Sequence, residues 1–313
     1  MLPFPPMAGE LLEISDLVID YDPVTLDRRP VKCADVVARL SRAGQRRGAQ
    51  IAAALPTRHG VLEDVAIDAL LLRAHTELQR LSEEFMQGAR VRRLLGPLCA
   101  ALRAVGVARP IRVVDVGCGL GYVIRWLAAH GELGDDVELI GCDYNAALIA
   151  GARAATAEEQ LRCTFVVANA FTLADPATVF LSSGVLHHFR GDELVAFFRA
   201  QAQIEHVQAL LHYDIHPSWL SGIGSWMFHT VRMREPLARH DGVVSARRAH
   251  GGDTLLAAAR AGAPGLALTL FETPSDILPV TRTLRPIVGV RAAIRAPLEH
   301  ALGALAHHLG PWR

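Results

Sequence analysis

The segment 113–122, with the sequence VVDVGCGLGY, has the clearest chemical meaning in the chain. An apolar run ends at Asp115, and glycines follow at alternate positions, Gly117, Gly119 and Gly121. Glycine has no Cβ, so the backbone can turn sharply there and a ligand can approach it closely. A buried strand that turns through such a loop into a helix is typical of a nucleotide-like binding site. The alternative is an ordinary tight connection between a strand and a helix.

The glycine spacing separates this loop from two other nucleotide-binding loops. A dinucleotide fingerprint needs G-x-G-x-x-G, whereas Tyr122 occupies the position of its third glycine. The phosphate-binding sequence G-x-x-x-x-G-K-[ST] does not occur in the chain. The D-x-G-x-G-x-G form instead resembles motif I of the class I S-adenosylmethionine (SAM)-dependent methyltransferases.

This resemblance covers about residues 111–290 and implies SAM as the cofactor. Asp115 would hold the glycine turn and approach the cofactor's amino group, while Asp143 would accept hydrogen bonds from both ribose hydroxyls. Tyr144 would flank the adenine. Asn169 stands where the family usually has Asp, and its amide oxygen can also accept a hydrogen bond from adenine. The residues that the resemblance assigns to the cofactor are Asp115, Gly117, Cys118, Gly119, Gly121, Asp143, Tyr144, Asn169, Ala170 and Ser183.

The residues facing the methyl acceptor are expected after the fourth and fifth strands. His187 and His188 belong to a Leu-His-His element that resembles one found in small-molecule methyltransferases of this class. One imidazole would act as a general base or orient the substrate. The alternative is that these histidines only position the loop. The further catalytic candidates are Asp214, at the end of the fifth strand, and His229.

His212, Asp214 and His216 alternate along the fifth strand, so their side chains would point to one side. Two imidazoles and a carboxylate are metal ligands. They make an incomplete set on one strand end, however, and neighbouring strands cover much of such a face. We therefore predict no metal site and assign Asp214 to the substrate.

The segment 215–251 is long for a connection, which is typical of lids and binding loops. Its aromatic and imidazole side chains are Trp219, Trp226, Phe228 and His229, and its candidate anion-binding arginines are Arg232, Arg234, Arg247 and Arg248. As a lid, this segment would favour a carboxylate- or phosphate-bearing substrate. Arg90, Arg92 and Arg93 suggest the same more weakly. The alternative is an amphipathic helix with its aromatic residues packed on the sheet.

The elements that position these residues alternate between strand and helix from residue 111 onward. This alternation predicts an α/β fold with a doubly wound, mainly parallel, seven-stranded Rossmann-like sheet. The expected strands are 111–116, 137–142, 163–167, 178–183, 207–214, 266–271 and 284–290, with helices at 120–130, 146–159, 192–203 and 253–261.

The first 110 residues are predicted to be mainly helical, with helices at 34–55, 61–86 and 91–105 and a short strand at 17–19. We interpret this region as a cap or dimerisation element, which allows a homodimer. The expected division is a helical region at 1–110, a SAM-binding domain at 111–291 and a C-terminal segment at 292–313, with its helix at 297–309.

The composition of the chain limits which binding partners and which cellular compartment we expect. The 32 basic residues balance the 32 acidic ones, so no overall field attracts nucleic acid or an anionic membrane. Five scattered cysteines without C-x-x-C spacing are typical of a reducing cytosol. The N-terminus lacks the basic region of a signal peptide, and no apolar run is long enough to span a membrane. These features predict a cytoplasmic protein.

We therefore predict a SAM-dependent methyltransferase acting on the oxygen, nitrogen or carbon of a small molecule, with no nucleic acid or membrane partner. The D/N-P-P-Y/F element that holds a flipped base is replaced by Ser-Ser-Gly-Val at 182–185. Two alternatives remain open. One is a SAM-binding protein without methyl transfer, such as a cyclase or structural subunit, and the other is a protein or RNA methyltransferase.

Overall fold

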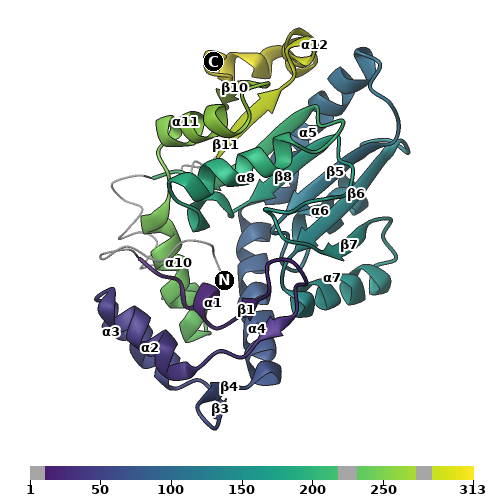
Figure 1. The fold of residues 1–313 in the computed structure, drawn as a ribbon. Coiled ribbons are helices and arrows are strands. Elements are labelled where there is room, and N and C mark those ends of the chain that lie inside the picture. Colours follow the sequence, from purple (N-terminus) through teal and green to yellow (C-terminus); the bar gives the residue numbers. More distant parts are fainter. Residues whose placement is uncertain (1–10, 218–230, 273–283) are drawn as a thin grey trace. The chain divides into compact units, whose positions relative to one another are not determined.

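The computed structural model describes residues 11–217, 231–272 and 284–313 (Figure 1). The contacts between residues divide the chain into two compact units. The first unit joins the N-terminal residues up to Arg80 with 217–249, and the second joins 81–216 with 250–313. The predicted domain boundaries stay a prediction, because these units describe packing and not separate functions.

The second unit contains the seven-stranded sheet that the alternating pattern predicts, and the fold class is confirmed. The strands, in chain order, are β5 (Ile111–Val116), β6 (Val137–Asp143), β7 (Thr164–Val167), β8 (Val179–Ser183), β9 (Ala209–Ile215), β10 (Ala267–Leu270) and β11 (Leu284–Val290). Their order across the sheet is β10-β11-β9-β8-β5-β6-β7. Strands β5 to β9 are parallel to their neighbours among these five, whereas β11 runs antiparallel to both β9 and β10.

The chain changes direction at β5, and this reversal positions the site. From β5 the chain proceeds outward to β6 and β7, and then returns to the other side of β5 as β8. The loops after β5 and β8 therefore diverge at the carboxyl edge of the sheet. Ligands of open α/β sheets bind in the crevice at such a switch point.

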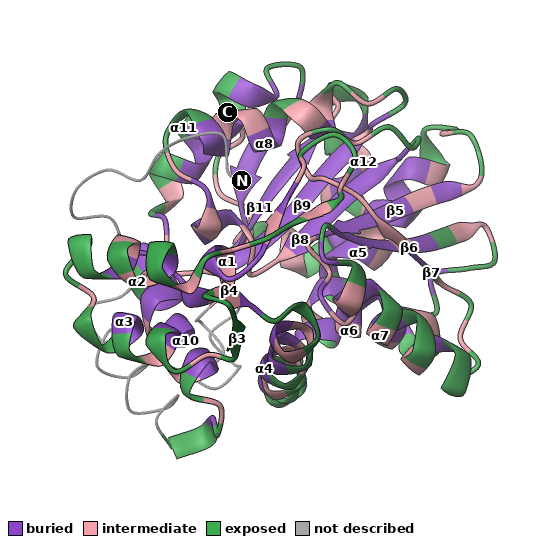
Figure 2. Cartoon of the chain, turned by 60° about the horizontal axis from the view of Figure 1, so that its bottom comes forward, coloured by how far each residue is buried: buried purple, intermediate pink, exposed green. Residues whose placement is uncertain are grey.

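Helices cover both faces of this sheet, and the strands are buried between them (Figure 2). Alternation along each strand sends Val113 into one core and Val114 into the other. The first core includes residues of α5 (Gln87–Ala104), α6 (Tyr122–His130), α7 (Ala146–Glu158) and α12 (Ala292–Leu302). The second includes residues of α8 (Asp192–Ala202) and α11 (Gly252–Gly262).

The C-terminal helix begins earlier than the sequence suggested. It starts at Ala292 and contains Pro297, and a 3-10 helix follows over Gly303–His308. Proline favours the first turn of a helix, which led to the wrong start at residue 297. Here Pro297 lies inside a helix whose Ile294, Leu298 and Leu302 are buried in the core next to α5.

The described part of the first unit is mainly helical, with short two-stranded ladders. Its elements are α1 (Ile14–Leu17), β1 (Asp20–Tyr21), β2 (Arg28–Arg29), α2 (Cys33–Arg42), α3 (Arg46–Ala53), β3 (Thr57–Arg58), β4 (Val61–Leu62) and α10 (Pro236–Arg248). Helix α4 (Asp64–Glu84) begins in this unit and continues into the second. No described helix of the chain has an apolar stretch long enough to cross a bilayer.

Two predictions for the N-terminal region were wrong. The residues 17–19 do not form a strand, because α1 ends at Leu17 and the strand β1 begins at Asp20. The single helix predicted over 34–55 is divided into α2 and α3. Gly44 separates the two with a φ of +77°, a left-handed conformation that ends a helix readily.

We expect Gly121→Ala to lower the free energy of unfolding more than Gly106→Ala. Both glycines have left-handed backbone, with φ of +71° and +73°, so both substitutions carry a strain of about 1–2 kcal/mol. Only at position 121 would a new Cβ collide with a neighbour, the buried ring of Phe165, which adds about 1–3 kcal/mol. Denaturant titration of both variants measures the difference, and equal losses would contradict the tight packing of this loop.

Candidate active site

The glycine loop between β5 and α6 is anchored to the end of β6. The backbone N–H groups of Gly117 and Cys118 both donate to the carbonyl of Cys142, at 2.8 and 3.0 Å. The N–H of Gly121 donates to the carbonyl of Cys118 at 2.8 Å. All three glycines of the loop have positive φ, including Gly119 at +54°. The alternating glycines therefore allow a backbone conformation that would be strained for residues with side chains.

The turn after β8 lies directly against this loop. A Cβ placed on Gly117 would come 2.7 Å from a methyl group of Val185, which no real contact tolerates. The N–H of Gly184 donates to the carbonyl of Tyr213 at 2.9 Å, which holds the turn against β9. The loops that follow β5 and β8 are thus in contact at the carboxyl edge of the sheet.

Asp143, at the end of β6, is buried and binds the backbone of the loop. Its Oδ2 accepts a hydrogen bond from the N–H of Gly119 at 3.0 Å, and its Oδ1 accepts one from Asn145 at 2.9 Å. Burial raises the pKa of this carboxyl, although the two backbone bonds act against the increase. A carboxylate offers about four lone-pair sites, so these bonds are compatible with ribose hydroxyls as further partners. The ribose contact stays a prediction.

Asp115 and Ser183 carry buried polar atoms whose partners are missing. Neither Asp115 Oδ1 nor Ser183 Oγ has a hydrogen-bond partner in the described parts of the chain. Burial, together with the charge of Asp143, holds the pKa of Asp115 well above its usual range. Leaving such atoms unpaired costs about 1–3 kcal/mol each. A ligand with a cationic amino group would satisfy Asp115, so this edge of the sheet fits the amino-acid part of SAM.

The expected adenine side of the site is only partly defined. Tyr144 is 40% exposed at the end of β6, which leaves its ring available to a planar ligand. Asn169 Oδ1 accepts a hydrogen bond from the N–H of Phe171 at 3.0 Å, so this side chain shapes the turn after β7. Ala170 packs on the core beside α8. Their contacts with adenine stay predictions.

His187 and Asp214 form a buried pair across the ends of β8 and β9. The backbone N–H of His187 donates to Asp214 Oδ2 at 2.6 Å, and its Nδ1 lies 2.8 Å from Oδ1. The N–H of Ile215 also donates to Oδ1, at 2.7 Å. Burial acts to raise the pKa of Asp214, but His187 and the backbone bonds hold it below its usual range. Asp214 therefore holds the imidazole of His187 in place, and its own contact with a substrate stays a prediction.

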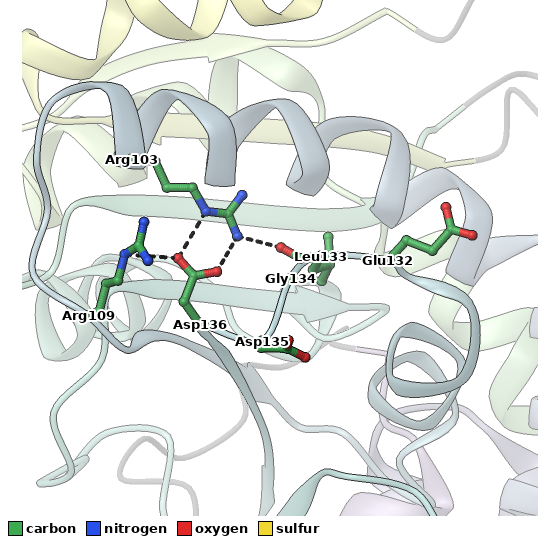
Figure 3. Close-up of a pocket in the computed structure, with 7 residues that line it drawn as sticks. All are labelled: Arg103, Arg109, Glu132, Leu133, Gly134, Asp135 and Asp136. Atoms are coloured by element: carbon green, nitrogen blue, oxygen red, sulfur yellow. Dashed lines mark hydrogen bonds and ion pairs between the residues drawn. The ribbon is translucent and has the colours of Figure 1, made fainter.

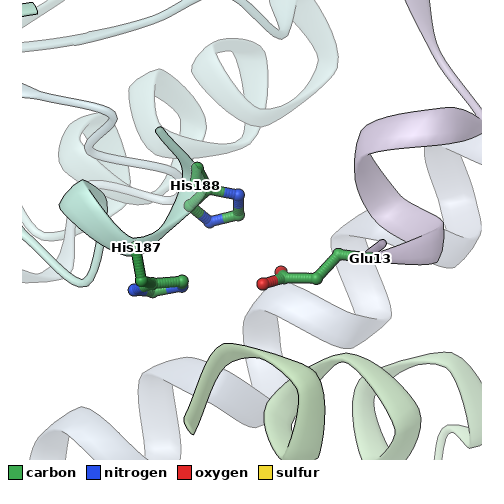
Figure 4. Close-up of side chains that lie close together, drawn as sticks. All are labelled: Glu13, His187 and His188. Atoms are coloured by element: carbon green, nitrogen blue, oxygen red, sulfur yellow. The ribbon is translucent and has the colours of Figure 1, made fainter. Parts of the chain in front are cut away.

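His188 lies beside His187 on the same short 3-10 helix, Leu186–His188 (Figure 4). The ring centroids are 4.5 Å apart and the planes are inclined by 31°. The imidazole of His188 acts electrostatically on Asp143, which places it toward the predicted ribose site. The turn thus directs one histidine toward Asp214 and the other toward Asp143. His229, the remaining catalytic candidate, lies outside the described residues.

The alternating residues His212, Asp214 and His216, in and just after β9, have separate environments. His212 is fully buried, its Nδ1 lies 2.9 Å from Ser182 Oγ, and its ring packs against two phenylalanines of α8. Burial lowers its pKa to about 3. Asp214 instead binds His187, and His216 is only half-buried. His212 is therefore a neutral core residue.

The structure describes the segment 215–251 only in part. Trp219, Trp226, Phe228 and His229 lie outside the described residues. Arg248 is buried in α10 and forms ion pairs with Glu13 and Asp16 of its own unit, at 3.5 and 3.2 Å. Its charge is already compensated, so its predicted role as an anion partner for substrate was wrong. Three other arginines, Arg232, Arg234 and Arg247, are exposed.

A hollow lies at the opposite, amino-terminal edge of the sheet, next to the starts of β5 and β6 (Figure 3). Arg103 donates two hydrogen bonds to Asp136, at 3.0 and 2.6 Å, and Arg109 forms an ion pair with the same carboxylate at 3.3 Å. Both arginines thus share one carboxylate as their partner. The bonds to Asp136 hold the loop before β6 in place. The hollow lies away from the edge where the glycine loop and His187 are found.

Part of the chain matches a known protein family. Residues 113–204 match the family model described as "Methyltransferase domain". No curated protein sequence was matched. Among solved structures, magnesium protoporphyrin IX methyltransferase from Synechocystis PCC 6803 with bound SAH is 17% identical, with 83% of this chain and 99% of that chain covered and a TM-score of 0.43. A plantazolicin methyltransferase, BamL, is 14% identical, with 71% and 96% covered and a TM-score of 0.48.

The domain match covers the glycine loop, Asp143, and the two histidines. It agrees with the resemblance on which the sequence prediction rested: residues 113–204 are similar to a methyltransferase domain, for which SAM is the expected cofactor. What the sequence missed is the pairing of His187 with Asp214, since each was treated as a separate candidate. Their positions at the ends of adjacent parallel strands were the available signal.

We expect Asp143→Ala to weaken SAM binding more than about tenfold, because charge-assisted hydrogen bonds to the ribose and to the loop are lost together. Calorimetry with SAM measures the effect. The exposed Asp253 of α11 provides a matched control as Asp253→Ala. Unchanged affinity in the Asp143 variant would remove this residue from the site.

We expect Asp115→Asn to stabilise the ligand-free protein while weakening SAM binding. The raised pKa of Asp115 means that ionisation above the unfolded-state pKa, about 3.9, costs folding free energy. The variant should therefore gain about 1 kcal/mol at pH 7, and the gain should vanish as the pH falls toward 4. Thermal melts across this pH range, without ligand, would contradict the prediction if the variant were less stable at neutral pH.

Proposed function

We propose that this SAM-dependent methyltransferase transfers the methyl group to a nucleophilic oxygen, nitrogen or carbon of a small molecule, in the cytoplasm. The observation that carries the proposal is the buried His187–Asp214 pair beside the glycine loop. A histidine held in this way is suited to orient or deprotonate a small nucleophile. The five free cysteines support a reducing compartment.

The hydrogen bond to Asp214 determines which nitrogen of His187 can act. With its proton on Nδ1, facing the ionised carboxylate, the neutral ring presents Nε2 as the proton acceptor. Asp214 also stabilises the imidazolium that forms when Nε2 takes a proton. This geometry supports a general base whose tautomer and orientation are set before the substrate binds.

The cofactor supplies an electrophilic methyl sulfonium when it is bound. Asp143 and Asp115 would hold its ribose and amino group, and the glycine loop would leave room for the methionine part. The chain then has to align the acceptor with the methyl group and exclude water. Because the methyl group is already reactive, the remaining requirement is to align and activate the acceptor.

A small-molecule acceptor is favoured over the alternatives by sequence and charge. Residues 182–185 lack the element that holds a flipped nucleobase, and the chain has no net charge to attract nucleic acid. A carboxylate- or phosphate-bearing acceptor is part of the proposal, supported by the arginine content of the segment 215–251. A homodimer through the N-terminal region is a further proposal, tested by light scattering in solution.

Transfer of labelled methyl from SAM to a panel of small phenols, amines, carboxylates and activated methylenes tests the function. Label incorporated into at least one small molecule supports the proposal. Label found only in peptide or RNA would replace it with the second alternative. SAM binding without any transfer would favour a SAM-binding protein that does not methylate.

We expect His187→Ala to lower kcat about 10²- to 10⁴-fold with little change in SAM affinity, as loss of a general base does. Asp214→Asn should lower kcat through the same imidazole, so the double variant should lose little more than His187→Ala alone. His188→Ala should lower turnover too. The exposed His206 offers a control as His206→Ala. Full activity in the His187 and His188 variants would mean that positioning alone suffices.

A further inference from the structure

Arg90, in the first turn of α5, carries a buried charge without a partner. The Nε, Nη1 and Nη2 atoms of its guanidinium are all buried, and none has a hydrogen-bond partner in the described parts of the chain. Burial lowers the pKa of this group, but arginine remains charged in proteins. An isolated buried charge is expensive, so proteins usually pair it. This guanidinium therefore points to an anion that the chain alone does not provide.

Contacts of the Arg90 backbone place it at the carboxyl edge of the sheet. The hydroxyl of Tyr213, near the end of β9, donates to the carbonyl of Arg90 at 3.0 Å. Tyr213 is paired in register with Ser183, the last residue of β8. The guanidinium is close enough to the phenol to act on it electrostatically. Arg90 thus lies at the edge where the loops after β5 and β8 meet.

Strand alternation puts two further unpaired polar groups, those of Asp115 and Ser183, on the same face as Arg90. Asp115 follows Val113, Ser183 follows Leu181, and Tyr213 follows Leu211, each by two residues. Val113, Leu181, Leu211 and Tyr213 all belong to the core that α5 and α6 cover. One face of the sheet edge therefore combines an unpaired carboxylate oxygen, an unpaired hydroxyl and an unpaired guanidinium.

Helix α5 is held tightly at this position. A Cβ on Gly88 would collide with the ring of Trp126 on α6, so the first turn of α5 approaches α6 as closely as a glycine permits. Gln87, the first residue of the helix, is buried as well. The guanidinium of Arg90 is consequently carried by a rigid element, as a preorganised binding group should be.

We propose that Arg90 binds the α-carboxylate of the cofactor's methionine part, opposite Asp115, which receives the α-ammonium group. One carboxylate and one guanidinium, both unpaired on one face, complement the two charges of an amino-acid zwitterion. The planar guanidinium can bind a carboxylate through two parallel hydrogen bonds. The assignment rests on the proposed function, because it takes SAM as the ligand. In the sequence, Arg90 was only a weak candidate for binding an anionic substrate, together with two neighbouring arginines.

The neighbouring arginines of α5 do not share this property. Arg92 donates to the carbonyl of Gly131 at 3.0 Å and forms an ion pair with Glu132 at 2.7 Å. Arg93 is exposed. A carboxylate on the methyl acceptor is the other source of an anion, but it would leave the ammonium site at Asp115 unexplained.

The test compares two ligands that differ in the amino-acid part. S-adenosylhomocysteine has the α-ammonium and α-carboxylate groups, whereas 5′-deoxy-5′-methylthioadenosine has neither. Calorimetry measures both affinities for the full chain and for Arg90→Met, with Arg92→Met as the matched control. We expect Arg90→Met to lose about 10- to 100-fold in affinity for S-adenosylhomocysteine and none for methylthioadenosine. Arg92→Met should bind both as the unmodified protein does.

The ligand-free melting temperature separates binding from structure. Removing an uncompensated buried charge should leave Arg90→Met at least as stable as the unmodified protein. Equal losses for both ligands, with a lower melting temperature, would make Arg90 a structural residue and overturn the proposal. Unchanged affinity for S-adenosylhomocysteine would overturn it in favour of an acceptor carboxylate. If Arg90→Met does not fold, Arg90→Lys must show the same selective, smaller loss. Failure of the unmodified protein to bind either ligand would refute the proposed function instead.

Discussion

The carboxylate of Asp143 connects the parts of this site that come from different strands. Asp143 is the last residue of β6. Its carboxylate accepts hydrogen bonds from the N–H of Gly119, in the loop after β5, and from the N–H of Asn145, at the start of α7. Two further N–H groups of the loop donate hydrogen bonds to the carbonyl of Cys142, the residue before Asp143. The conformation of the glycine loop therefore depends on the end of a neighbouring strand, and this dependence positions every group that would surround SAM.

The same edge of the sheet concentrates groups that are unfavourable in the ligand-free protein. Two carboxyls, Asp115 and Asp143, are buried close enough for the charge of one to raise the pKa of the other. Arg90 is buried without a partner on the face that Asp115 shares. Each group lowers folding stability and is offset by packing elsewhere. Such local instability is typical of binding sites that are preorganised for a charged ligand.

On the proposed acceptor side, by contrast, the buried polar groups are paired with one another. His187 and Asp214 satisfy each other, and the backbone of His187 and Ile215 completes the bonds of the carboxylate. Asp214 is ionised because its pKa is held low, so the imidazole keeps one orientation and one tautomer. Under the proposed function, unpaired charges would bind the charged cofactor, and a paired base would bind the neutral nucleophile. The unpaired groups come from β5, β8 and α5, whereas the paired histidine and aspartate lie at the ends of β8 and β9.

Local sequence determined the fold class, the strands of the sheet and the glycine turn, because alternation of apolar residues and the need for positive φ act over a few residues. It also determined which chemical groups stand at the strand ends, from Asp143 to His187. Only the tertiary structure decided how these groups pair: Asp214 with His187, His212 with Ser182, and Arg248 with Glu13 and Asp16. It also showed that the guanidinium of Arg90 has no hydrogen-bond partner among the described residues. Pairing depends on which distant segments become neighbours and on how much water each group loses, and neither quantity is written in the local pattern.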